Sequence, residues 1–455
     1  MTAAAADAQV LVVGAGPAGS STAHHLARLG LDVLVLDRAR FPRDKPCSEY
    51  MSPEASRILR GMGALDAIEA AGAAHLAGMV VRAPGGTSFR GEFAGAAAQG
   101  FRGASDRGLA LRRRILDPIL MHAARDAGAR VVEGERVLDL LTDGRGRVVG
   151  VRTAEREGGP PRERRAAVVV GADGLRSVVA RRLGLARRLP WPRRVALVGH
   201  YRGVAALGDV GEMHVERGVY LGIAHVGGGV ANVALVVPAG AARGIGADRA
   251  AFVEAWIGRL PHLAPRFERA ERVSAVHATG PFAAAARRAW SPGAALVGDA
   301  ADFFDPFTGE GIYAALRGGE LAAPLIADAA RAGDAARADR ALGEYEALRR
   351  REFGGKWMVE RAIGAAVASP LLMDHAARTL SRRRDMADLL VGVTGDFVPA
   401  REVLRPGFVW RLLVGPLGSH VRELVAYHSP ARVIPTEPRT HCRGDGGAPI
   451  PTEEP

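Results

Sequence analysis

The chain has 455 residues, 48% hydrophobic and 24% charged, which is typical of a globular enzyme with more than one domain. Two cysteines, Cys47 and Cys442, are too few for a disulfide framework or a cysteine-based metal centre. The net charge of +12 comes almost wholly from arginine, but aromatic residues make up only 5%, so we expect no nucleic-acid partner. We expect a cytoplasmic protein, because the N-terminus lacks a signal-peptide pattern and no apolar stretch is long enough to cross a bilayer.

The first 37 residues predict a strand, a glycine-rich turn, a helix and a second strand. An apolar run at 9–13 precedes Gly14-Ala15-Gly16-Pro17-Ala18-Gly19, and a second strand-like run ends at Asp37. This order is typical of a dinucleotide-binding βαβ unit, in which the acid after the second strand accepts hydrogen bonds from ribose hydroxyls. Arg38, which follows that acid, is a further candidate cofactor contact.

Each residue of this turn has an expected role. Gly14 permits a tight turn, Gly16 lets the backbone approach a pyrophosphate, and Gly19 removes a side chain where helix meets sheet. Pro17 and Ala18 begin a helix whose unpaired N–H groups and positive end attract phosphates. The turn therefore predicts a dinucleotide cofactor, without deciding between FAD and a nicotinamide.

The next segments predict alternating helices and strands. Ser52-Pro53-Glu54 reads as a helix N-cap, a proline at the first helical position and an acid in the first turn. The remaining pattern predicts strands near 79–82, 87–93, 130–132, 137–141, 148–153 and 166–171, and a helix over 115–127.

A different architecture follows, because strand-like segments now succeed one another with glycine turns between them. This pattern predicts an antiparallel sheet in a second domain, built from 195–201, 212–215, 219–225 and 230–237. Beyond it we expect a helix at 248–260, strands at 273–278 and 294–297, and long helices from Gly311 to about 351 and across 376–391.

These elements predict two domains that alternate along the chain, followed by a helical region and a tail. The tail is rich in Pro, Gly and Thr, a composition typical of disorder. The expected division is 1–78, 109–190 and 281–335 for the cofactor domain, 79–108 and 191–280 for the substrate domain, 336–428 for the helical region and 429–455 for the tail.

Three later segments carry a family resemblance. Val170-Gly171-Ala172-Asp173-Gly174 resembles the Asp-Gly fingerprint of the para-hydroxybenzoate hydroxylase superfamily, and the segment 296–312 resembles its Gly-Asp fingerprint. Arg113-Arg114-Ile115-Leu116-Asp117 is similar to its Arg-x-x-aromatic/aliphatic-Asp segment. The resemblance covers roughly residues 9 to 395. It implies an α/β fold, with FAD in a Rossmann-type three-layer ββα domain, an antiparallel substrate domain and C-terminal helices.

The resemblance implies further cofactor contacts. Asp299 would bind ribitol hydroxyls, Arg113 would face the pyrophosphate, and Gly309 and Gly311 would leave room for the isoalloxazine edge. The N–H groups at Ile312 would face the flavin N1–C2=O locus. Asp173 reads equally well as a cofactor contact and as a helix N-cap before Leu175. The remaining candidate cofactor contacts are Val137, Gly174, Gly298 and Pro306.

The segment Lys45-Pro46-Cys47-Ser48-Glu49 resembles the Lys-x-Cys-Gly-Glu/Asp segment of the superfamily's geranylgeranyl reductase branch. Ser48 stands where that branch has glycine. Its Tyr-x-Trp-x-Phe-Pro motif should fall near Tyr220, where only the tyrosine is present. Cys47, Tyr220 and His225 are the candidate catalytic residues, and a packing or surface role is the alternative for each.

The leading functional hypothesis is an FAD-dependent monooxygenase that acts on a hydrophobic small molecule through a flavin hydroperoxide. The alternative is reduction of carbon–carbon double bonds in a prenyl or polyene substrate. A flavin halogenase ranks third, because the Trp-x-Trp-x-Ile-Pro signature is absent, and a non-catalytic flavin-binding protein ranks last.

The resemblance also implies an electron donor, either NAD(P)H bound transiently or a separate reductase. No second glycine fingerprint follows a strand, since Gly227-Gly228-Gly229 reads as a hairpin turn. The apolar stretch near 403–417 could cover the pocket, form a dimer contact or rest on a membrane surface as a peripheral contact.

Overall fold

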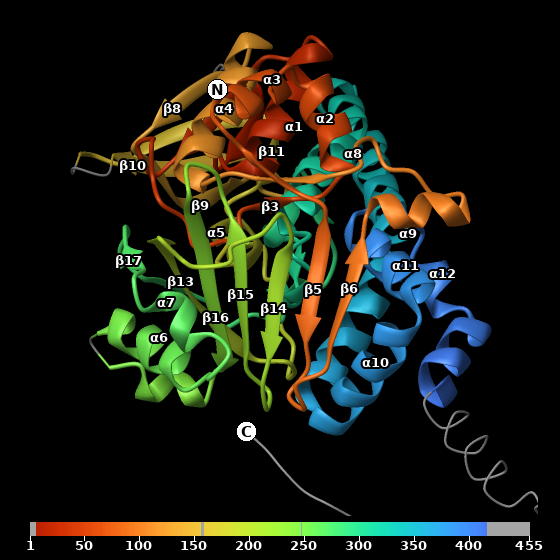
Figure 1. Cartoon of the computed structure of the whole chain (residues 1–455). Coiled ribbons are helices and arrows are strands. Elements are labelled where there is room, and N and C mark those ends of the chain that lie inside the picture. The colour runs from red at the N-terminus through yellow and green to blue at the C-terminus, as the bar shows by residue number, and fades with distance from the viewer. Residues whose placement is uncertain (1–5, 156–158, 247, 416–455) are drawn as a thin grey trace, which may run out of the picture.

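The computed structural model describes residues 6–155, 159–246 and 248–415. Two large sheets lie one above the other in Figure 1, and long helices run along one side of both. The expected tail at 429–455, and the last part of the helical region, lie outside the described residues.

The upper sheet is mainly parallel. Its strand order is β20-β21-β11-β1-β2-β8, and only the β20–β21 pair is antiparallel. The strands are β1 (Ala8–Val13), β2 (Val33–Asp37), β8 (Arg130–Glu133), β11 (Arg162–Gly171), β20 (Trp290–Ser291) and β21 (Ala294–Leu296). In this register Val13 lies beside both Leu36 and Gly171, so the carboxyl ends of three neighbouring strands meet at one edge.

Helices cover one face of this sheet, and an antiparallel pair extends the other side of it. The helix α1 (Pro17–Arg28) packs between α4 (Arg113–Asp126) and α8 (Gly311–Arg331). The strands β9 (Glu135–Thr142) and β10 (Val148–Glu155) form an antiparallel extension of β11. This arrangement confirms the predicted α/β class with a Rossmann-type cofactor domain.

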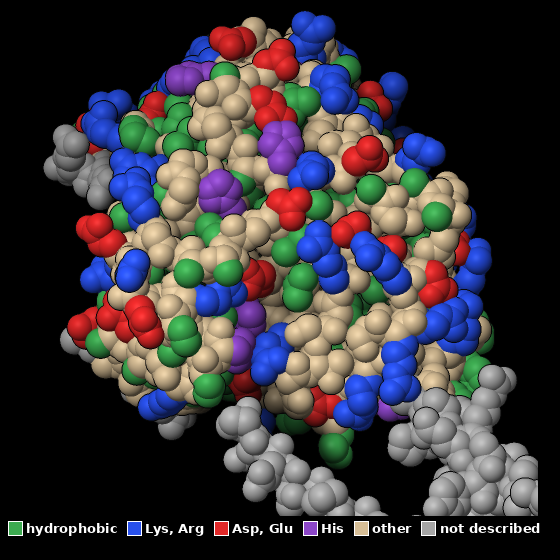
Figure 2. Space-filling model, in the orientation of Figure 1, with side chains coloured by type: hydrophobic (Ala, Val, Ile, Leu, Met, Phe, Trp, Pro, Cys, Tyr) green, Lys and Arg blue, Asp and Glu red, His purple; other side chains and the backbone are tan. Residues whose placement is uncertain are grey.

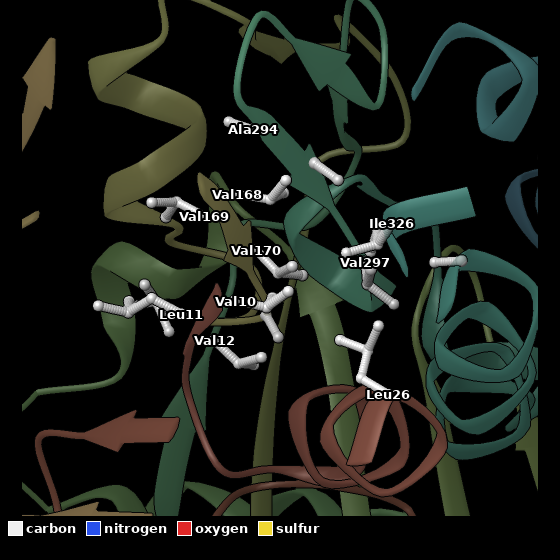
Figure 3. Close-up of a cluster of buried hydrophobic side chains, with 14 of the residues drawn as sticks. Val10, Leu11, Val12, Leu26, Val168, Val169, Val170, Ala294, Val297 and Ile326 are labelled. Carbon is white, nitrogen blue, oxygen red and sulfur yellow. The ribbon is translucent and has the colours of Figure 1, made fainter. Parts of the chain in front are cut away.

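The strand residues explain why the parallel sheet is buried. β1 ends in Val-Leu-Val-Val and β11 ends in Val-Val-Val-Gly, and these buried ends are apolar throughout, as expected for strands covered on both faces, whereas β11 begins with charged residues. In Figure 3, Leu26 of α1 and Ile326 of α8 point toward Val10 and Val297, and all four side chains are fully buried. The helices are thus held to the sheet by apolar packing, which fixes the turn at the start of α1.

The lower sheet is mostly antiparallel and takes strands from two separate parts of the chain. Its order is β17-β13-β16-β15-β14-β5-β6, and β18 also pairs with β13. The strands are β5 (Gly78–Arg82), β6 (Ser88–Glu92), β13 (Arg194–Arg202), β14 (Gly211–Val215), β15 (Tyr220–His225), β16 (Val230–Pro238), β17 (Glu271–Arg272) and β18 (His277–Thr279). The pair β5–β14 is parallel, and it joins the early hairpin to the later strands.

Helices flank this sheet on both faces. α6 (Arg249–Gly258) and α7 (Ala264–Phe267) lie on its outer side in Figure 1. The C-terminal helices cover the other side and the β6 edge; they are α9 (Ala335–Ala368), α10 (Pro370–Arg382), α11 (Arg384–Thr394) and α12 (Arg401–Leu404), followed by a helical stretch at 406–415. None of the helices within the described ranges is long and apolar enough to span a membrane.

Short elements complete the fold. They are α2 (Ala55–Gly61), α3 (Leu65–Ala70), α5 (Val178–Arg182), β3 (Tyr50–Met51), β4 (Ala74–Leu76), β7 (Gly108–Ala110), β12 (Ala186–Arg188), β19 (Ala284–Ala286) and β22 (Asp302–Phe303). Single 3₁₀ turns occur at Ala94–Gln99, Ala241–Gly244, Gly298–Ala300 and Pro306–Thr308.

Two local predictions were wrong. α2 begins at Ala55 instead of Pro53, and the buried Ser52 hydroxyl makes no hydrogen bond to any described residue, so Ser52 is not the N-cap. Of the strand expected at 273–278, only residues 277 and 278 lie in a strand, β18, and a second short strand, β17, precedes the expected range; each pairs with a different part of β13.

Candidate functional site

A cavity of about 610 Å³ lies between the carboxyl edge of the parallel sheet and the inner face of the antiparallel sheet. Most of the predicted site residues line it: Gly14, Gly16, Pro17, Ala18, Asp37, Arg38, Cys47, Arg113, Val137, Asp173, Gly174, Tyr220, Asp299, Pro306, Gly309, Gly311 and Ile312. Gly19, Gly298 and His225 are not among its lining residues. Residues far apart in the sequence are thus brought together around one elongated space.

The glycine-rich turn occupies one end of the cavity. Gly14 has a φ of +102°, and a Cβ there would lie 2.6 Å from the carbonyl oxygen of Ala172. A Cβ on Gly19 would lie 1.7 Å from the carbonyl oxygen of Gly14, so this glycine serves helix–sheet contact as predicted. A Cβ on Gly16, by contrast, would have no atom closer than 3.7 Å. Gly16 is therefore the glycine whose missing side chain leaves space open.

Asp37 anchors the turn through its carboxylate. Its Oδ2 accepts a hydrogen bond from the backbone N–H of Ala15 at 2.8 Å, and its Oδ1 accepts one from Ala39 at 2.8 Å. Each carboxylate oxygen has a second lone pair that can accept a hydrogen bond from a ribose hydroxyl. The acid at the end of β2 thus both orders the turn and faces the cavity.

A basic corner lies beside the turn. Arg113 donates from Nε and Nη2 to the two oxygens of the buried Asp117, at 2.6 and 2.8 Å, and Arg43 contacts the same carboxylate at 3.0 Å. Both guanidinium groups lie within 3.8 Å of the position that a Cβ on Gly16 would occupy. A helix N-terminus with two fixed arginines fits the pyrophosphate of a dinucleotide.

The cavity wall carries opposite charges on Lys45 and Asp299, whose side chains are half-buried. Burial raises the pKa of Asp299, while Lys45 and Arg113 act in the opposite direction. Burial is also the main reason that the pKa of Lys45 is lowered. The Lys45 Nζ lies 3.3 Å from the position of a Cβ on Gly174, which has a φ of +77°. Our sequence reasoning assigned no role to Lys45 or Arg43, although Lys45 begins the segment that carries the branch resemblance and Arg43 lies two residues before it.

Asp173 lies on the cavity wall and also contacts the start of α5, although it is not the N-cap of that helix. Its Oδ2 accepts a hydrogen bond from the backbone N–H of Val178 at 2.6 Å. The side chain of Ser177 caps the same short helix through Ala180, so α5 begins at Val178 and not near Leu175. Burial raises the pKa of the Asp173 carboxyl.

The segment 305–312 closes the other end of the cofactor half, and α8 begins at Gly311 as predicted. Gly309 has a φ of +74°, and a Cβ there would lie 2.9 Å from the Tyr50 ring; a Cβ on Gly311 would lie 3.4 Å from Phe303. Gly309 is therefore needed for the close approach of the Tyr50 ring, whereas a side chain on Gly311 would meet only ordinary contact, and room for the isoalloxazine edge at this segment stays a prediction. Both residues nevertheless line the cavity.

Tyr220 is tied to this segment. Its hydroxyl donates to Asp305 Oδ1 at 2.7 Å, and Arg194 donates to Asp305 Oδ2 at 2.7 Å. Burial, followed by the adjacent Asp305, raises the pKa of Tyr220 well above its usual value. The hydroxyl thus stays protonated and engaged, so Tyr220 positions the 305–312 segment instead of presenting a free acid.

His225 lies on β15 but does not line the cavity, because alternate residues of a strand point to opposite faces and Tyr220 and Gly222 face inward. Burial lowers its pKa. The structure therefore does not bring this candidate catalytic residue to the site. The inner wall of the substrate half is apolar instead, with Val198, Met213 and Val236 from the sheet and Phe303 and Phe307 from the loop.

Cys47 lines the cavity between these two halves. Its carbonyl accepts a hydrogen bond from Asn232 Nδ2 at 2.9 Å, which joins its segment to β16. Burial raises the pKa of its thiol, although Arg113 acts in the opposite direction. The thiol therefore keeps its proton at neutral pH.

Glu49 is a structural residue that sequence reasoning did not assign. It is buried with a φ of 63°, and its Oε1 accepts a hydrogen bond from the backbone N–H of Arg113 at 2.8 Å. Its Oε2 contacts His200 Nε2 at 2.7 Å and Asn232 Nδ2 at 3.0 Å. One carboxylate thus links the first turn of α4 to two strands of the antiparallel sheet. The only available signal was the acid that ends the Lys45–Glu49 segment.

The fold and this cavity together define a flavoprotein oxidoreductase with FAD as its cofactor. Residues 7–205 match the family described as an FAD binding domain. The chain is 30% identical over 405 residues to a digeranylgeranylglycerophospholipid reductase of Methanopyrus kandleri, covering 86% of this chain and 93% of that protein. It is 29% identical over 432 residues to a menaquinone reductase of Mycobacterium tuberculosis, covering 89% and 95%.

Among solved structures, a myxobacterial chondrochloren halogenase is 26% identical to this chain and superposes with a TM-score of 0.71. The superposition covers 78% of this chain and 82% of the halogenase. The chain belongs to the para-hydroxybenzoate hydroxylase superfamily of FAD-dependent oxidoreductases, in its geranylgeranyl reductase-like branch. The predicted family is therefore confirmed.

Proposed function

We propose that this protein is an FAD-dependent reductase that saturates carbon–carbon double bonds in a hydrophobic, prenyl-type chain. The observation that carries the proposal is the pair of contacts that Cys47 makes: its thiol interacts with Arg113 of the basic corner, and its carbonyl accepts a hydrogen bond from Asn232 of the antiparallel sheet at 2.9 Å. The relatives named as reductases support it, since they match this chain over most of their length.

In such a reaction, different residues of the chain would bind the cofactor, bind the substrate and donate a proton. The turn at Gly16, with Arg113 and Asp37, would hold the dinucleotide portion of FAD, which supplies a hydride when it is bound and reduced. The apolar wall, including Met213 and Phe307, would bind the chain and exclude water. Cys47, which holds its proton at Sγ, would donate that proton to the second carbon, and solvent would restore it.

The electron donor in this proposal is NAD(P)H, bound transiently, or a separate reductase that delivers electrons to the same cofactor. The glycines at 227–229 lie between β15 and β16 in a hairpin, so they do not form a second dinucleotide turn.

The experiment is anaerobic reoxidation. The purified holoenzyme is reduced without oxygen, mixed with menaquinone or a geranylgeranyl lipid, and followed by flavin absorbance and product mass. The proposal expects reoxidation without oxygen and a product that gains two hydrogens. Absence of anaerobic reoxidation, together with an oxygen atom in the product under air, would contradict it.

That contrary outcome is the expectation of the second candidate, a monooxygenase acting on a hydrophobic small molecule. The likeness to the chondrochloren halogenase supports this candidate, because that neighbour is described as an FAD-dependent halogenase and not as a double-bond reductase. Both candidates use the same cavity and differ in whether oxygen enters the product.

Cys47→Ala tests the proton-donor role. We expect the turnover number for double-bond reduction to fall by about a hundredfold, the scale of losing a general acid, with flavin content unchanged. Because burial raises the thiol pKa, wild-type activity should persist through neutral pH and decline only above the usual thiol range. Full activity in the alanine variant would remove Cys47 from the mechanism.

A further inference from the structure

Large apolar side chains are exposed together on the C-terminal helices. Of the nine exposed large hydrophobic residues within the described ranges, five lie on α10 and the 406–415 stretch, and we call these the apolar face: Leu371, Leu372, Val409, Trp410 and Leu413. Leu371 is 83% exposed and Trp410 is 67% exposed. Side chains of this size are seldom left so exposed in a group unless the surface meets a partner.

The two helices are packed against each other. The carbonyl oxygen of Leu412 accepts hydrogen bonds from His375 at 3.1 Å and from Thr379 at 3.2 Å, both on α10. Phe408 is buried and Leu412 packs against the same apolar core, so one side of the 406–415 stretch faces inward. Helical periodicity then places Trp410 on the opposite side, pointing outward.

The helices that carry the apolar face expose many arginine side chains and few carboxylates. Of the five carboxylates within residues 370–415, Asp385 is exposed, Asp374 and Asp396 are half-buried, and Asp388 and Glu402 are buried. The two half-buried carboxylates are already engaged, since Asp374 accepts a hydrogen bond from the backbone N–H of Gly85 at 2.6 Å and Asp396 pairs with Lys356. The exposed arginines of the same residues are Arg378, Arg382, Arg383, Arg384, Arg401, Arg405 and Arg411. Figure 2 shows basic side chains gathered over the region of α10, α11 and α12 at the lower right.

The charge argues against a second copy of this chain as the partner. A twofold contact would bring the same arginine-rich surface from each copy together, and like charges across an interface are costly. An anionic lipid surface is complementary instead. Tryptophan prefers the headgroup level, leucine enters the acyl boundary, and arginine stays with lipid phosphates.

We propose that the apolar face docks this protein onto the surface of an anionic membrane. The inner sides of the same helices are connected to the cavity wall through the apolar core, since Met373 and Leu380 belong to the cluster that contains Tyr220 and Phe307. Docking would place the wall of that cavity next to the bilayer. The proposal stands on surface residues alone and does not depend on the reaction.

The experiment measures co-sedimentation of the full-length holoprotein with vesicles of phosphatidylcholine alone or mixed with phosphatidylglycerol. We expect binding to the anionic vesicles that weakens as salt is added. Trp410→Ser with Leu413→Ser should weaken this binding by roughly tenfold or more. Arg378→Gln and Arg411→Gln, neither of which forms an ion pair with a described residue, should each weaken it by about fivefold.

The matched control is Leu29→Ser with Ile115→Ser, which removes two exposed hydrophobic residues from the cofactor domain. This control should bind vesicles as the wild type does, and all variants should keep full flavin content. Binding that is equal in the Trp410 variant and the control would overturn the proposal. An absence of vesicle binding would also overturn the proposal. If light scattering then shows a dimer that the Trp410 variant loses, the apolar face contacts a second copy of the chain instead.

Discussion

The two glycine-rich segments at the ends of the cofactor half look alike in sequence but serve different contacts. In the turn at 14–19, Gly16 leaves open space in front of two arginines, while Gly19 allows the helix to touch the backbone of Gly14. In the segment 305–312, Gly309 makes way for the ring of Tyr50, whereas a side chain on Gly311 would meet only ordinary contact with Phe303. Glycines in the two segments thus meet different neighbours, and the cofactor contacts predicted for Gly309 and Gly311 stay predictions.

The second difference lies in what holds each segment. Asp37, at the end of β2, fixes the first turn through backbone N–H groups of the same domain. Asp305 fixes the second through side chains of the antiparallel sheet, Tyr220 and Arg194. The first segment belongs to the cofactor domain alone, whereas the second is coupled to the part of the fold that would meet substrate.

Gly19→Ala is expected to have the largest effect, because its Cβ would overlap the Gly14 carbonyl oxygen at 1.7 Å and neither backbone can move freely. We expect a loss of more than about 4 kcal/mol in unfolding free energy, the range of severe core substitutions. Thermal unfolding and soluble yield measure it. Gly61→Ala is the control, since a Cβ there meets nothing within 4 Å, and its stability should stay close to that of the wild type.

Gly16→Val should separate cofactor binding from folding. Its side chain would enter the space beside Arg113 and Arg43, so FAD affinity should fall by about a hundredfold, the scale of losing two charge-assisted hydrogen bonds. Flavin content after purification and titration of the apoprotein with FAD measure this loss, and circular dichroism should remain native. A fully yellow Gly16→Val protein would mean that the pyrophosphate lies elsewhere.

Tyr220→Phe should have the smallest effect and act on the second segment only. It removes one hydrogen bond to Asp305 while Arg194 still contacts that carboxylate, so the cost should be about 1 kcal/mol with FAD retained. Tyr201→Phe is a matched control, because the buried Tyr201 hydroxyl has no hydrogen-bond partner among the described residues. The comparison fails if both variants lose the same stability and leave the flavin spectrum and turnover unchanged.

Sequence reasoning succeeded where a pattern is local. The turn at 14–19 lies between a strand and a helix, and glycines, helix start and acid fall within a few tens of residues. The start of α8 at Gly311 was predictable for the same reason. The antiparallel sheet was predictable because glycine turns separate its strands.

It failed where a contact joins distant segments or where a strand is buried on both faces. Glu49 contacts His200 and Asn232, which lie on other strands more than a hundred residues further along the chain, so no sequence spacing indicates the contact. β15 and β16 are apolar on both sides, and their pattern therefore could not show that His225 points away from the cavity.

The parallel pairing of β5 with β14 has a practical consequence for engineering. Because the substrate sheet is woven from residues 78–92 and 194–279, with cofactor-binding segments before, between and after them, it cannot be cut out as one continuous piece. A chimaera that borrows substrate preference from a relative must exchange both stretches at once. Grafting only the later one would leave β14 beside a foreign hairpin whose side chains never fitted it.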